Sequence, residues 1–89
     1  MSTHSSHPDI IKHLKRAEGH LRSIIDMMET NRGCLDVAQQ LQAVESAIAN
    51  AKRVLIHDHI DHCLDHAMQG DGKDSANAVR EFKEITKYL

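Results

Sequence analysis

The sequence predicts an all-α protein of three helices, of which the second is much longer than the other two. Residues 34–63 contain no glycine or proline, and no stretch of the chain has the alternating pattern of a strand. Small or apolar residues recur there at alternating steps of three and four, which is typical of a long helix packed against other helices. These residues are Cys34, Val37, Leu41, Val44, Ile48, Ala51 and Leu55.

The first helix is expected from Pro8 to about residue 30, after a flexible polar tail of residues 1–7. Proline suits the first turn of a helix, where its missing N–H would have no intrahelical partner, and Asp9 suits the positive end of the helix dipole. Gly33 follows the helix and is available for a left-handed C-terminal cap. The expected apolar stripe is Ile10, Leu14, Ala17, Leu21, Ile24 and Met28.

The second helix is expected from Cys34 to about Met68, where residues 70–72 end it. At roughly 35 residues it would be about 50 Å long, and one short chain cannot cover both sides of such a helix. The sequence therefore predicts dimerisation through this helix. A third helix is expected after it, capped by Asp74 or Ser75. Its expected buried stripe is Val79, Phe82, Ile85 and Leu89.

Composition limits the class of protein. The 89 residues are enough for one domain, expected at 8–89, with a modest core of the kind that oligomerisation often supports. No apolar run approaches the length of a membrane span, and the N-terminus lacks the apolar segment of a signal peptide, so we expect a cytoplasmic protein without a membrane partner. In the cytosol, two cysteines indicate metal or redox chemistry more than a structural disulfide.

The two cysteines and one histidine are the first candidates for a metal site. His59 and Cys63 are four residues apart, so they project from one helix face on adjacent turns. Cys34 lies 25 residues before His59, about 37 Å along a continuous helix. An antiparallel partner helix would bring Cys34 of one chain beside His59 and Cys63 of the other. The alternative is that Cys34 is a small buried residue of the helix seam.

Thiolate and imidazole ligands suit Cu(I), Zn(II), Ni(II) or Co(II) and argue against magnesium or calcium. Cys63 and His59 also have the spacing of a thiol–base pair, but the chain has almost no loops on which to build an active site, so we expect no enzyme. Other histidines are available as further ligands, although surface positions are their ordinary explanation. They are His4, His7, His62 and His66.

Four segments of the chain resemble the CsoR/RcnR/FrmR family of bacterial transcriptional repressors. They are LKRAEGHLRSI, a cysteine that opens a helix, QQLQAVESAIANA and HDHIDHC. The resemblance extends from about residue 8 to residue 88, and Cys34, His59 and Cys63 match the family's sensing positions. It implies an antiparallel four-helix-bundle dimer with a third helix appended, and commonly a tetramer. Family members bind operator DNA when unliganded and release it when the inducer binds.

The resemblance implies a metal site of Cys34, His59 and Cys63 that spans the dimer, with Glu81 at the position that orients the ligand histidine. A cysteine–histidine–cysteine set resembles the copper(I) branch. Nickel-sensing members add an N-terminal histidine, so the expected inducer is Cu(I) or Ni(II)/Co(II), which derepresses efflux genes. Gly33 stands where copper sensors often carry a tyrosine, and His20 replaces the usual glutamine.

The expected contacts to operator DNA are phosphate contacts from the locally basic first helix and from two cations of the second. These cations are Lys12, Lys15, Arg16, Arg22, Lys52 and Arg53. Taken without the resemblance, such weak basicity is the ordinary property of a solvated helix face. Two alternatives stay open: a thiol-based formaldehyde or persulfide sensor of the same fold, and a metal-buffering helical protein that does not bind DNA.

Overall fold

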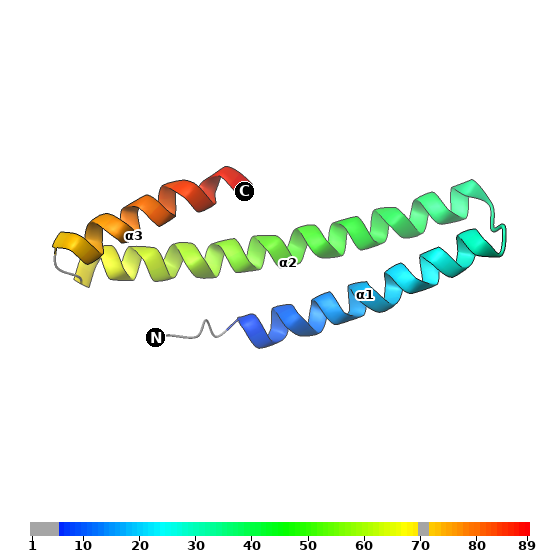
Figure 1. Cartoon of the computed structure of the whole chain (residues 1–89), viewed down its shortest axis with the longest axis horizontal. Helices are drawn as coiled ribbons and strands as arrows, with labels where there is room; N and C mark the ends of the chain where they lie inside the picture. The colour runs from blue at the N-terminus through cyan, green and yellow to red at the C-terminus, as the bar shows by residue number, and fades with distance from the viewer. Residues whose placement is uncertain (1–5, 70–71) are drawn as a thin grey trace. The chain divides into compact units, whose positions relative to one another are not determined.

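The computed structural model describes residues 6–69 and 72–89 (Figure 1). They form helices α1 (His7–Glu29), α2 (Cys34–Gln69) and α3 (Gly72–Ile85), followed by the short 3-10 helix η1 (Thr86–Tyr88). This confirms the predicted all-α protomer with one long central helix, and the described residues contain no strand. The bounds of α1 and α2 differ from the expected ones by a residue or so. None of the described helices is long and apolar enough to cross a membrane.

The chain divides into two compact units, and α2 contributes to both. Residues 8–52, called the hairpin unit here, contain most of α1 and the first half of α2. Residues 53–89, together with the segment before Pro8, form the second unit, called the site unit here. Each unit is described separately.

Helix α1 and the first half of α2 run antiparallel in the hairpin unit, as Figure 1 shows. Their core is formed by Ile24 of α1 with Val37 and Val44 of α2, and Met27 packs against it. Buried residues recur every seven positions on both helices, which is the spacing of one packed column per helix. These residues are Ile10, Ala17 and Ile24 on α1, and Val37, Val44 and Ala51 on α2.

The expected seam of α2 divides into two columns. Val37, Val44 and Ala51 are buried, whereas the alternate seam positions are exposed in the single chain. The exposed apolar column of α2 consists of Cys34, Leu41, Ile48 and Leu55. The same division on α1 leaves Leu14, Leu21 and Met28 exposed. Each of these two apolar stripes is therefore divided into a buried and an exposed column, because one neighbouring helix covers only one column.

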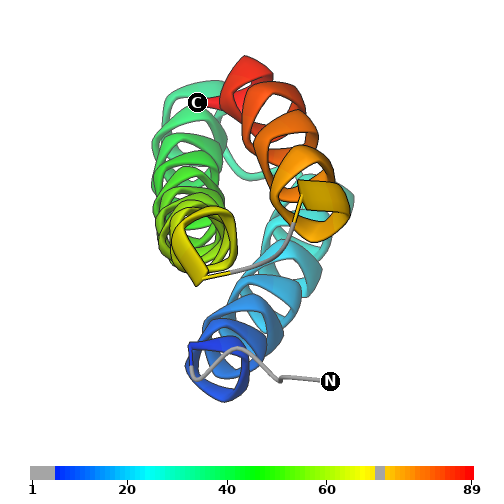
Figure 2. The same ribbon diagram turned by 90° about the vertical axis from the view of Figure 1, so that its left-hand side faces the viewer.

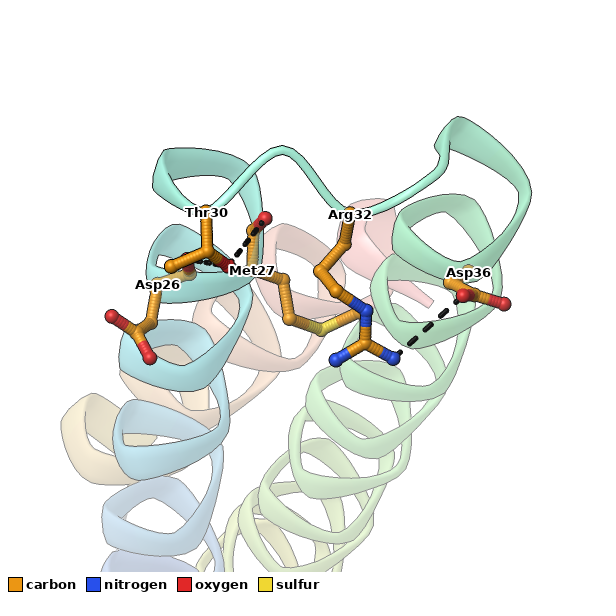
Figure 3. A network of polar contacts seen from close by, with 5 residues as sticks. All are labelled: Asp26, Met27, Thr30, Arg32 and Asp36. Carbon is orange, nitrogen blue, oxygen red and sulfur yellow. Dashed lines mark hydrogen bonds and ion pairs between the residues drawn. The ribbon is translucent and has the colours of Figure 1, made fainter.

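The turn between α1 and α2 ends the first helix through its backbone (Figure 3). The N–H groups of Asn31 and Arg32 donate to the carbonyls of Met28 (3.2 Å) and Met27 (2.9 Å), which is a Schellman motif. The Thr30 hydroxyl also donates to carbonyls of the last turn, those of Asp26 (2.9 Å) and Met27 (3.2 Å). These bonds satisfy carbonyls that the end of α1 would otherwise leave unpaired.

The residue in the left-handed conformation of this turn is Asn31, with φ of 62°, and Gly33 has no positive φ. The expectation that Gly33 would provide the left-handed cap is therefore wrong. Asparagine tolerates this conformation better than most residues with a Cβ. The Gly33 carbonyl instead accepts the N–H of Val37 (3.1 Å) at the start of α2.

Helix α3 lies beside the later turns of α2 in the site unit, as Figures 1 and 2 show. The buried residues are Ile56 and Cys63 of α2 and Ala78 of α3. Phe82 and Ile85 are half-buried, as expected for part of the stripe. The other two expected positions, Val79 and Leu89, are exposed, so the buried face of α3 is centred on a small alanine instead of the larger valine beside it.

The start of α3 also differs from its expected cap. The helix begins at Gly72, so Asp74 and Ser75 lie inside its first turn. The Ser75 hydroxyl donates to the Ala67 carbonyl (3.0 Å), one of the last four carbonyls of α2. Ser75 therefore links α3 to α2, because its hydroxyl pairs with a carbonyl that the end of α2 would otherwise leave without an intrahelical partner.

Two neighbouring substitutions test which residue of this turn provides the left-handed cap. We expect Asn31→Ala to lower the free energy of unfolding by about 1 kcal/mol, because alanine is strained in the left-handed region. Gly33→Ala should be neutral or stabilising, by up to about 1 kcal/mol, because its φ is not positive and a Cβ there meets open space. Urea unfolding followed by circular dichroism at one fixed protein concentration measures both. The opposite ranking would restore Gly33 as the cap.

Candidate metal centre

Three side chains of the site unit place potential metal ligands together. His59 and Cys63 of α2 and Glu81 of α3 each offer a ligand atom, and these atoms all lie within 4.8 Å of one another. The spacing of four residues puts His59 and Cys63 on adjacent turns of one face, and α3 brings Glu81 to the same place. Among the described residues, no other group of three or more His, Cys, Asp or Glu side chains lies close enough together to hold a metal ion.

The three side chains differ strongly in exposure. Cys63 is 3% exposed, the His59 side chain is 24% exposed and the Glu81 side chain is 63% exposed. Burial raises the pKa of the Cys63 thiol above 9.0, and the negative charge of Glu81 raises it further. Without a cation nearby, the thiol is therefore held in its protonated form at neutral pH. A bound metal ion would reverse both effects, because its charge favours the thiolate.

His59 and Glu81 form a direct contact between α2 and α3. The Nε2 atom of His59 lies 3.2 Å from Oε1 of Glu81. A histidine that binds a metal through one ring nitrogen commonly donates the other N–H to a carboxylate, which fixes the orientation of the ring. The sequence-based role of Glu81, orientation of a ligand histidine, is compatible with this geometry, and the carboxylate is also close enough to be a ligand itself.

The remaining candidate ligands are not part of this group. Cys34 is exposed at the start of α2 in the single chain. His7 and His62 are half-buried, and neither belongs to the group. His4 lies outside the described residues, as does the side chain of His66.

The N-terminal segment is nevertheless attached to the site unit. The Ser6 hydroxyl donates to Oδ2 of Asp58, at 2.7 Å. Asp58 immediately precedes His59 in α2, and Ser6 immediately precedes the half-buried His7. The start of the described chain therefore contacts the same stretch of α2 that carries the ligand pair.

The sequence analysis did not predict a hollow beside His59 and Glu81. Its volume is about 480 Å³, and its lining residues are His59, Arg80, Glu81, Glu84, Ile85 and Tyr88. Glu81, Ile85 and Tyr88 recur at steps of four and three, so helical spacing was the available signal. No motif pointed to them, because only Glu81 matches a family position.

The candidate DNA-binding cations are all exposed: Lys12, Lys15, Arg16, Arg22, Lys52 and Arg53. Apart from Arg53, they belong to the hairpin unit, whereas the ligand group belongs to the site unit.

A comparison with protein families matches residues 6–88 to the family described as metal-sensitive transcriptional repressor. The copper-sensing transcriptional repressor CsoR of Bacillus subtilis is 39% identical over 80 residues, covering 88% of this chain and 79% of the relative. The CsoR of Mycobacterium ulcerans is 40% identical over 78 residues, and the match covers 88% of this chain but 65% of the relative.

A solved structure also matches nearly the whole chain. The nickel-responsive transcriptional regulator InrS superposes with a TM-score of 0.81 at 28% sequence identity, over 99% of this chain and 97% of that one. The three-helix protomer is thus shared with this regulator.

The electrostatics of the group can be tested without a metal. We expect Glu81→Gln to lower the pKa of Cys63, because it removes a negative charge that opposes the thiolate, while burial still raises this pKa. The rise of thiolate absorbance near 240 nm with pH measures this in a Cys34→Ala, Tyr88→Phe background, where Cys63 is the remaining thiol and no tyrosinate absorbs. Glu84→Gln is the matched control on the same helix and should leave the titration unchanged. Equal titration curves for the Glu81→Gln protein and its parent would contradict the assigned contact.

Proposed function

Because this chain belongs to the family of metal-sensitive transcriptional repressors, we propose that it binds operator DNA in its metal-free form and releases it when a metal ion binds. The observation that carries the proposal is the group of His59, Cys63 and Glu81, which places a nitrogen, a sulfur and an oxygen ligand within reach of one ion. Release derepresses genes for metal efflux or resistance. As a repressor it is not an enzyme, and residues 8–89 act as one repressor domain in the cytoplasm.

Cys34 of the partner subunit completes the metal site in this proposal. The exposed column of Cys34, Leu41, Ile48 and Leu55 supports it, since these residues recur every seven positions and are uncovered in a single chain. An antiparallel α2 from a second copy would cover this apolar column and carry its own Cys34 toward His59 and Cys63. The proposed assembly is a four-helix-bundle dimer, and two dimers form a tetramer.

Within the site, we assign Cys34, His59 and Cys63 as the ligands and Glu81 as the residue that orients His59. The 3.2 Å contact between Nε2 of His59 and Glu81 supports this assignment, because a metal-binding histidine commonly donates its other ring N–H to a carboxylate. Metal binding expels the thiol proton of Cys63, so affinity rises with pH.

Two classes of metal fit the ligand set. Soft thiolates favour Cu(I), and the curated relatives are copper sensors. Ni(II) or Co(II) would recruit further nitrogen ligands, for which His4, His7, His62 and His66 are the candidates. The bond between Ser6 and Asp58 supports this second possibility, since it attaches the N-terminal segment to the unit that carries His59 and Cys63.

The metal must bind the DNA-incompetent conformation more tightly than the DNA-bound one, and DNA must then weaken metal binding by the same factor. A metal that joins Cys34 of one chain to His59 and Cys63 of another fixes the hairpin unit of the first chain. The basic residues of that unit contact phosphates in the metal-free form, so affinity should fall steeply with salt. The candidates for these contacts are the exposed cations Lys12, Lys15, Arg16, Arg22, Lys52 and Arg53.

A titration of the reduced protein with Cu(I), and separately with Ni(II), identifies the inducer. We expect thiolate-to-copper absorption in the ultraviolet to saturate at one Cu(I) per protomer if the protein is a copper sensor. Visible Ni(II) bands at tight one-to-one binding would instead place it with the nickel sensors. Glu84→Gln is the control that leaves the ligand group intact. Weak binding of both metals would overturn the metal-sensing proposal and favour reaction of the exposed Cys34 thiol with an aldehyde or persulfide.

Substitution of Cys34 separates sensing from DNA binding. The probe is a fluorescent duplex selected from a random-sequence library with the wild-type protein, and anisotropy measures its affinity. Metal should weaken wild-type binding by about 5- to 150-fold, the usual range of such coupling. Cys34→Ala should bind the duplex like the wild type but lose the effect of metal, and Cys63→Ala should behave in the same way. Loss of DNA affinity in the metal-free Cys34→Ala protein would contradict the assignment of Cys34 to sensing.

A further inference from the structure

A hydrogen bond between exposed side chains joins α1 to α2 in the hairpin unit. Nε2 of His20 lies 2.6 Å from Oε1 of Gln40, and the two residues are 20 positions apart in the chain. An amide oxygen can only accept, so the ring N–H of His20 donates. The bond fixes the amide of Gln40 by its oxygen and leaves the amide nitrogen to donate elsewhere. Neither the apolar core nor the metal site explains this pair.

His20 belongs to a row of α1 that carries positive charge and no carboxylate. Lys12, Arg16 and His20 follow one another at steps of four, so they stack on successive turns. Lys15 and Arg22 lie elsewhere on the helix, at steps of three and four from Glu18, which is in the same row. Glu18 lies within the second row, whereas the first row is bordered at its start by Asp9, three residues before Lys12.

The two rows border different faces of the hairpin unit. At 100° per residue, the exposed apolar residues Leu14 and Leu21 separate the row of Lys15 and Arg22 from the buried column of α1. The row of Lys12, Arg16 and His20 lies on the other side of that buried column. A second chain that covers the apolar residues therefore approaches the Lys15 side and leaves the His20 side open.

The α2 surface next to this row carries two small side chains. Gln40, Ala43 and Ala47 recur at steps of three and four, and all three are exposed. Alanine side chains beside a row of cations allow a bulky polyanion to approach closely. Two carboxylates border the surface: Asp9, at the start of α1, and Asp36, which is 3.7 Å from Arg32.

We propose that the flank formed by Lys12, Arg16, His20 and Gln40 is the surface that contacts the DNA backbone. Lys12 and Arg16 neutralise phosphates, and His20 holds Gln40 so that its amide N–H groups face a phosphate oxygen. His20 is thus a positioning residue. The inference rests on the proposed DNA-binding function and narrows it, because it excludes Lys15 and Arg22 from the primary contact surface.

Paired substitutions on the two rows test the proposal. The probes are the selected duplex and a mixed-sequence duplex of equal length, and affinity is measured by anisotropy at several salt concentrations. Loss of Lys12 or Arg16 to alanine should weaken binding of both duplexes and reduce the slope of log affinity against log salt by about 1. Lys15→Ala and Arg22→Ala are the matched controls on the same helix and should leave the slope unchanged.

The His20–Gln40 pair has its own signature. His20→Ala and Gln40→Ala should each weaken binding several-fold, and the double substitution should weaken it no further than Gln40→Ala alone, because the two residues act through one contact. His20→Gln retains an N–H donor and should restore affinity. Circular dichroism and size-exclusion chromatography, run on every variant, exclude loss of fold or of assembly as the cause.

The outcomes distinguish failure of the proposed DNA-binding function from failure of the assigned contact surface. A wild-type protein that selects no duplex and binds none at low salt would overturn the proposed function itself. A wild-type protein that binds, but loses affinity on substitution of Lys15 or Arg22 and not of Lys12, Arg16 or Gln40, would overturn only the assignment of this flank.

Discussion

The length of α2 is the constraint on which the rest of the structure depends. Its 36 residues correspond to about 54 Å of helix, and one chain of 89 residues covers only part of that surface. Helix α1 packs against the column of Val37, Val44 and Ala51 and leaves Leu41 and Ile48 uncovered. The apolar surface that remains supports the proposed dimer, in which the partner would also supply a further thiolate.

The candidate metal site lies on the same helix, in the part of α2 that packs against α3. Cys63 is buried beneath α3, so its thiol resists ionisation, while the contact of His59 with the largely exposed Glu81 lies nearer the solvent. His59 and Cys63 would hold the metal ion, whose charge would favour the thiolate. The carboxylate of Glu81 opposes a bare thiolate, and it would stabilise a metal-bound histidine by accepting its N–H.

The sequence was sufficient for the helices and for the residues of α2 that form the site, because helical spacing alone places His59 and Cys63 on one face. It was insufficient where packing or hydrogen bonding with another segment decides which residue is buried or which residue ends a helix. Whether Val44 or Leu41 is buried depends on which column α1 covers, and both are equally apolar. The left-handed residue of the turn is Asn31 and not Gly33, since hydrogen bonds to Met27 and Met28 set the position of the cap. The His20–Gln40 bond joins residues whose types carry no motif.

The division into two units constrains how metal binding can reach DNA. The ligands His59 and Cys63 belong to the site unit, whereas Lys12, Arg16 and Cys34 belong to the hairpin unit. Within one chain, the two units are joined through α2 and through the start of α1. In the proposed dimer, the metal would bond directly to Cys34 of the partner subunit, on the same hairpin unit that carries the proposed DNA contacts. If so, the dimer is the smallest species whose DNA affinity can respond to metal. A monomer with an intact His59–Cys63 pair would bind metal without a change in its affinity for DNA.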